Sequence, residues 1–176
     1  MGLLCSALLA CSPRPVPLVE SGVPALQAPA DPLIEFLARR EWLSFAQAVR
    51  APALNLPAAE LACLDQLQPD EFIPVMQGVV GAQFSADEQA TARAFLASPA
   101  GQQLSAAVLA TLNGQAQAMA QMQQAMGAAD LQAQARFTQT AVGLQIVGGL
   151  GPKARERIAA EVSPFVRRCQ GAVTVG

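Results

Sequence analysis

The sequence of 176 residues contains no histidine and no tyrosine, and only 14% of its residues are charged. Without histidine the chain lacks the commonest general base and metal ligand, and Ser–His and Cys–His nucleophile pairs are excluded. Eleven Lys and Arg residues against thirteen Asp and Glu give a net charge of −2, whereas a nucleic-acid surface needs a concentrated basic face. We therefore predict no catalytic residue, no cofactor and no nucleic-acid partner.

Long apolar runs and strand signals are also scarce. Beyond the N-terminus the nearest candidate for a membrane span is Ala141–Leu150, far shorter than the roughly 18 apolar residues that a span needs. β-branched residues are sparse, and Ala, Leu and Gln, which favour helices, dominate from residue 31 onward. This composition predicts an all-α fold.

The first eleven residues are apolar and end in Leu8-Leu9-Ala10-Cys11, which resembles the lipobox of bacterial lipoproteins. In that family the Cys becomes the acylated N-terminus of the mature chain. Residues 1–10 would then be a signal-like segment and Cys11 the lipidation site. Two features depart from the pattern: no Lys or Arg precedes the apolar run, and the run is short. A start codon upstream of Met1 would account for both.

The same letters allow other readings. Met1-Gly2-Leu-Leu-Cys5-Ser6 also fits the N-myristoylation pattern, and a plain secreted protein is a further alternative. The Pro-rich composition of the residues that follow favours a lipoprotein, since such a chain forms an extended tether that reaches on the order of 60 Å. We therefore expect a linker at 11–31 and export to the periplasmic face of a bacterial membrane, with a lipid anchor.

Two further cysteines, Cys63 and Cys169, would remain in the mature chain. In an oxidising compartment they favour one disulfide, and the alternative is a pair of buried free thiols. Neither belongs to a Cys-x-x-Cys pair, which argues against a thiol-redox catalyst.

Residues 32–176 are predicted to form a single compact domain of six to eight helices, with Asp31 as the first N-cap. In the first helix, Leu33, Phe36 and Leu37 belong to the buried stripe, whereas the charged Arg39, Arg40 and Glu41 occupy the other side. No internal repeat is evident. The helices are expected at about 32–49, 57–67, 69–81, 85–97, 99–112, 114–126, 130–147 and 153–169, the last with a kink or restart at Pro164.

The clearest local signals surround the fourth of these helices. Ser85 and Glu88 form a capping-box pattern at its start. Ser98 and Pro99 are typical of the N-cap and first position of the next helix, where Gly101 would allow a close helix approach. A functional groove at this Ser-Pro-x-Gly corner is the alternative to that structural role.

Residues 84–145 resemble the bacterial exported proteins grouped as domain of unknown function 2059. The resemblance rests on an acidic capped helix followed by Phe-x-x-Ser-Pro-x-Gly-Gln, with matching residues at Phe95, Ser98, Pro99, Gly101 and Gln102. It implies a helical, exported protein. The family carries no established activity, so the resemblance implies no site residue.

Three methionines, Met119, Met122 and Met126, share one helical face at i, i+3 and i+7. Soft thioethers can hold Cu(I), although methionines at this spacing usually fill a core. A groove for a partner or ligand is a third possibility. The function that we expect is a non-enzymatic helical domain of the cell envelope that contacts another envelope protein or an apolar ligand. Periplasmic Cu(I) handling through the methionine face is the alternative.

Overall fold

The computed structural model describes residues 31–172, and the side chains of residues 31–170. The predicted signal-like segment, the lipidation site Cys11 and nearly all of the Pro-rich linker lie outside the described residues. Within that range the chain forms nine α-helices and two 3-10 helices and no strand, which confirms the all-α class.

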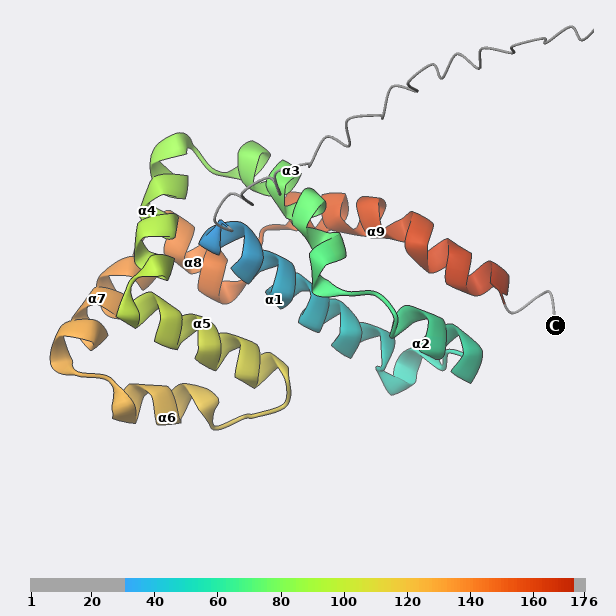
Figure 1. The fold of residues 1–176 in the computed structure, drawn as a ribbon, viewed down its shortest axis with the longest axis horizontal. Helices are drawn as coiled ribbons and strands as arrows, with labels where there is room; N and C mark the ends of the chain where they lie inside the picture. Colours follow the sequence, from blue (N-terminus) through green and yellow to red (C-terminus); the bar gives the residue numbers. More distant parts are fainter. Residues whose placement is uncertain (1–30, 173–176) are drawn as a thin grey trace, which may run out of the picture.

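The elements follow one another with short connections (Figure 1). Their bounds are α1 Pro32–Val49, η1 Pro52–Leu54, α2 Ala58–Leu64, η2 Pro69–Phe72, α3 Ile73–Gln83, α4 Ala86–Ala97, α5 Pro99–Leu112, α6 Ala118–Ala125, α7 Ala128–Thr138, α8 Ala141–Gly148 and α9 Pro152–Ala172.

The number of α-helices in this range exceeds the expected six to eight, because the helix expected at 130–147 is two helices. Thr140 is extended, with ψ 153°, and its hydroxyl accepts a hydrogen bond from the Gly143 N–H (3.0 Å), so it ends α7 and caps α8. In contrast, α9 continues past Pro164 as one helix, where we expected a kink or a restart.

Helix α1 lies at the centre of the molecule (Figure 1) and packs against η2, α3, α4 and α5. The Asp31 carboxylate caps it by accepting hydrogen bonds from the backbone of Leu33 (3.0 Å) and Ile34 (3.4 Å). Leu33, Phe36 and Leu37 are buried as predicted. The remaining core comes from η2, from α3 to α8 and from the inner face of α9.

The prediction that Arg40 and Glu41 lie on the side of the helix opposite the buried stripe is wrong, because both side chains are largely buried. Arg40 is 8% exposed, and its Nη1 donates hydrogen bonds to the carbonyls of Ile146 (3.0 Å) and Gln145 (3.3 Å). These carbonyls belong to the last turn of α8, where helical partners are missing and negative charge accumulates. The guanidinium therefore caps α8 from the neighbouring helix, and this tertiary partner explains why a charged side chain is buried.

The structure contains a repeat that the sequence does not make evident. Helices α4 and α5 meet at a sharp corner, and α7 and α8 meet at an equivalent one, with α5 packed on α7 and α4 packed on α8. Each corner carries a Phe, then a Ser or Thr cap, then a Gly at the same spacing. The residues are Phe95, Ser98 and Gly101 in one corner and Phe137, Thr140 and Gly143 in the other.

The two corners are alike in atomic detail. Ser98 Oγ donates to the Phe95 carbonyl (2.6 Å) and accepts from the Gly101 N–H (3.1 Å), and Thr140 makes the same pair of bonds. A Cβ added at Gly101 would lie 1.9 Å from the Phe95 carbonyl oxygen, and one at Gly143 would lie 1.9 Å from that of Phe137.

The Phe95 and Phe137 rings stack at 3.8 Å between centroids and 10° between planes, which joins the two corners. We call α4, α5, α7 and α8 the paired-corner unit.

Candidate ligand-binding groove

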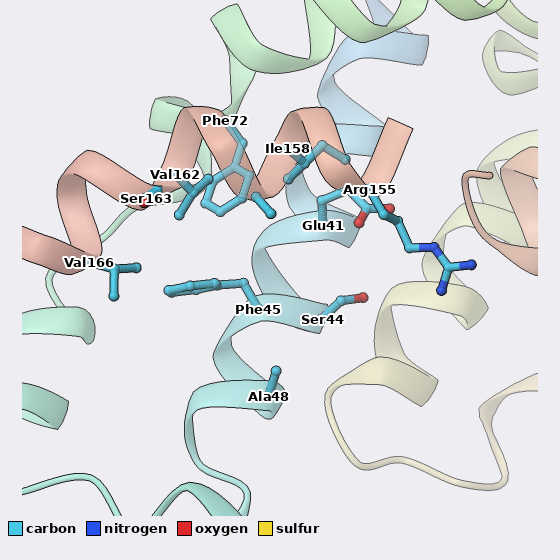
Figure 2. A pocket seen from close by; sticks show the side chains of 11 residues that line it. Glu41, Ser44, Phe45, Ala48, Phe72, Arg155, Ile158, Val162, Ser163 and Val166 are labelled. Carbon is cyan, nitrogen blue, oxygen red and sulfur yellow. The ribbon is translucent and has the colours of Figure 1, made fainter. Parts of the chain in front are cut away.

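A cavity of about 500 Å³ lies between the second half of α1 and the long helix α9 (Figure 2). Pockets for small ligands span about 300–1,000 Å³. We call this cavity the α1–α9 groove. It is lined by Phe45, Ala48, Phe72, Ile158, Ala159, Val162 and Val166, together with the polar residues Glu41, Ser44, Arg155 and Ser163.

The two walls of the groove share neighbours. Helices α1 and α9 both pack on α2 and α3, and α1 packs in addition on η2, α4 and α5. Phe72, at the end of η2, lies between the walls, and Phe45 tilts against it with ring centroids 6.1 Å apart. The apolar side chains of α1 and α9 therefore face each other across open space instead of interlocking.

A disulfide fixes the C-terminal part of the α9 wall. Cys63 of α2 and Cys169 of α9 are joined (S–S 2.07 Å), with their Cα atoms 5.5 Å apart. Since α2 follows α1 after one short 3-10 segment, the bond ties α9 back to the chain that continues from the opposite wall.

Three of the four polar side chains that line the groove gather at one end. In Figure 2, Glu41, Ser44 and Arg155 lie together, whereas Phe45, Val162 and Val166 lie on the opposite side. Ser163 is the polar residue nearest the apolar end, and its hydroxyl accepts a hydrogen bond from Arg167 one turn later in α9 (2.9 Å).

Of the two charged side chains that line the groove, Glu41 is the more buried. Its side chain is only 12% exposed, and burial raises the pKa of this carboxyl, while the positive charges of Arg40 and Arg155 oppose that rise. Arg40 Nη1 lies 3.8 Å from Glu41 Oε1 but is already committed to the α8 carbonyls. Burial lowers the pKa of Arg40 in turn.

Of the site residues predicted from the sequence, those within residues 31–170 do not line the groove. Ser85 and Glu88 form a capping box at the start of α4, in which the Ser85 N–H donates to the Glu88 carboxylate (2.8 Å) and the Glu88 N–H donates to Ser85 Oγ (3.3 Å). The bond from the Ser85 N–H and a second from the Ser85 hydroxyl to the same carboxylate (2.9 Å) lower the pKa of Glu88. Ser98, Pro99 and Gly101 build the first corner.

The methionine face lies mainly in the core. Met122 and Met126 are buried, and Met119 is partly buried and packs against the same core. Among the described residues no group of three or more Cys, Asp or Glu side chains could hold a metal ion. The Cu(I) alternative, which would use thioethers, stays a prediction.

The sequence predicted Phe45 and Val162 on buried helix faces, and Val162 is buried, but it did not predict the groove that both residues line. A pattern of apolar residues shows that a face avoids water, but not whether another helix covers it. The available signal was Glu41, a carboxylate set among Trp42 and Phe45 on the half-buried side of α1.

The wider context comes from comparison with known proteins, in which no family model, no curated protein and no solved structure matched the chain. The resemblance of residues 84–145 to domain of unknown function 2059 therefore stays a prediction. No helix in the described part of the chain is long and apolar enough to cross a bilayer.

Proposed function

We propose that this protein is a non-enzymatic ligand-binding domain of the bacterial cell envelope, held at the membrane by a lipid on Cys11. The α1–α9 groove takes up an apolar or amphipathic molecule. The observation that carries this proposal is the groove itself, a cavity of about 500 Å³ between two helices with apolar side chains on both walls and both charged ones at a single end.

The energetics support binding by apolar contact. Burial of apolar surface contributes roughly 25 cal/mol per Å², and the partly buried ring of Phe45 supplies an aromatic face to a ligand. The groove holds one carboxylate, Glu41, and one guanidinium, Arg155, with no histidine in the chain to pair with either. This is a set of groups suited to orienting a ligand.

Binding can be tested with the full-length chain and a neutral fluorescent apolar probe, N-phenyl-1-naphthylamine. Ala159→Trp places an indole in the groove and should abolish the rise in probe fluorescence. Ala160→Trp is the matched control, because Ala160 is exposed on α9 and does not line the groove. Equal fluorescence from both variants, or no response from the parent chain, would refute the proposal.

The membrane address is tested separately. Intact-mass measurement of the mature protein should show cleavage before Cys11 and the added mass of acyl chains, and Cys11→Ser should move the protein from the membrane fraction to the soluble one. A mature chain that retains residues 1–10 without a lipid would contradict the anchor and leave the groove untouched.

A further inference from the structure

The polar end of the α1–α9 groove presents two opposite charges that are not paired with each other. Glu41 and Arg155 both line it, and Arg155 is near enough to lower the pKa of Glu41. Yet none of the ion pairs within 4.0 Å among the described residues joins them. The ion pair of Glu41 within the described residues is a long one, 3.8 Å from Arg40 Nη1. Because Glu41 and Arg155 both line the groove, a ligand bound there can contact both side chains at the same time.

The distribution of polarity fits a molecule with a head and a tail. An amphipathic helix in a groove presents polar groups along its whole outer face, whereas here both charged groups of the lining lie at one end (Figure 2). The polar residue toward the other end is Ser163, whose hydroxyl accepts a hydrogen bond from Arg167. The α9 wall from Arg155 to Val166 rises by about 16 Å at 1.5 Å per residue. This length suits one acyl chain lying beside Phe45, Phe72 and Val162.

The charge of the ligand's head group follows from the same two residues, Glu41 and Arg155. A purely anionic head on Arg155 would stand against the Glu41 carboxylate, and a purely cationic head on Glu41 would stand against Arg155. Like charges brought together beside the mostly buried Glu41 carboxylate repel more strongly than in bulk water, because the effective dielectric constant there is below that of water. A head that carries both charges satisfies both residues.

We infer that the ligand of this groove is a zwitterionic amphiphile with a single acyl chain, of the lysophospholipid class. Its ammonium group lies at Glu41, its phosphate at Arg155, and its chain along the apolar walls. The inference rests on the proposed function, since it names the ligand class of the same groove.

The test is displacement of N-phenyl-1-naphthylamine from the full-length chain by four lauroyl-length amphiphiles below their critical micelle concentrations. They are lauroyl lysophosphatidylethanolamine, laurate, dodecylamine and dodecanol, which share tail length but differ in head charge. We expect the zwitterion to displace the probe at least tenfold more effectively than any of the other three. Glu41→Gln and Arg155→Gln should each reduce that advantage about tenfold.

Arg157→Gln is the matched control, because Arg157 lies on α9 near Gly78 of α3 and does not line the groove. It should leave the order of the four amphiphiles unchanged. Equal displacement by all four heads, or loss of the preference in the control as well, would overturn the inference while the groove remains a binding site. If the probe itself did not bind, that result would instead contradict the proposed function.

Two other occupants would give distinct results. If a model amphipathic helical peptide displaced the probe better than the zwitterion, the groove would belong to a helix of a partner protein. If sedimentation showed a ligand-free dimer that Ala159→Trp dissociates, a second copy of the chain would fill it. Either result would overturn the assignment to a lysophospholipid.

Discussion

In the paired-corner unit, helices meet backbone against backbone at Gly101 and at Gly143, whereas α1 and α9 face each other across a cavity of about 500 Å³. The first region closes because a residue without a side chain stands at each contact and a hydroxyl caps the helix that begins there. In the second region Phe45, Val162 and Val166 contact the core but leave a cavity between α1 and α9, and a disulfide holds α9 in place. Close packing stabilises one half of the molecule, and a covalent bond supports the other.

The largest effect on stability is expected when that covalent bond is removed. The double variant Cys63→Ser/Cys169→Ser should lose about 4 kcal/mol of unfolding free energy, since the bond closes a loop with a sequence separation of 106. Denaturant titration measures this change. Hydrogen exchange should rise in α9 before it rises in α4 and α5. Exchange that increases first in the paired-corner unit would contradict the comparison.

The second largest effect on stability is expected from substitutions at the two corners. Gly101→Ala and Gly143→Ala should each destabilise the fold by about 3 kcal/mol, because the new Cβ meets a backbone carbonyl that must shift. Gly81→Ala in α3 is the control, since nothing lies within 4 Å of its Cβ position, and it should stabilise by about 0.5–1 kcal/mol. If all three variants destabilise equally, close approach is not what matters at the corners.

A smaller effect is expected from the caps. Ser98→Ala and Thr140→Ala each remove a hydroxyl that bonds both helices of a corner, and each should cost about 1 kcal/mol in thermal or denaturant unfolding. Their similarity is the point of the test, because equivalent corners should respond alike. A large cost at one site and none at the other would break the equivalence.

The smallest effect concerns pH. Because burial raises the pKa of Glu41, the folded chain holds a proton more tightly than the unfolded one, and unfolding free energy should fall as pH rises from the ordinary glutamate pKa to the raised value. Glu41→Gln should flatten this slope and stabilise the protein slightly at neutral pH, as urea titrations at several pH values would show. An unchanged slope would contradict the role of burial.

Glu88 provides the opposite case for the same measurement. Hydrogen bonds from Ser85 lower the pKa of Glu88, so its contribution is present above the ordinary glutamate pKa and is lost as pH falls through the lowered one. Glu88→Gln should therefore weaken the fold at neutral pH and have little effect in acid. Matching pH profiles for the Glu41 and Glu88 variants would show that the two environments do not differ as described.

Sequence reasoning found the features that depend on local chemistry. The Asp31 cap, the Ser85–Glu88 capping box and the Ser98-Pro99 helix start are all set by neighbouring residues, and the structure has each of them. The second corner was missed because Thr140 and Ala141 stand where the first corner has Ser98 and Pro99. Thr is a weaker cap than Ser, and Ala gives no signal for a helix start.

The groove could not be predicted because it depends on which helices are neighbours in space. The same uncertainty misplaced Arg40, whose burial requires the end of α8, far away in the sequence. Amphipathic patterns identify the apolar faces of α1 and α9, but the distance between those faces is set by α2, α3 and η2, which hold the two helices apart.

Under the proposed lipid anchor at Cys11, Asp31 would have a mechanical role. The same carboxylate that caps α1 also accepts a hydrogen bond from Arg93 of α4, with 2.8 Å between Nε and Oδ2. Any tension on the preceding residues thus enters the folded part at a point secured to two helices. Because α1 packs on η2, α3, α4 and α5, such a load would pass to several elements of the described fold at once.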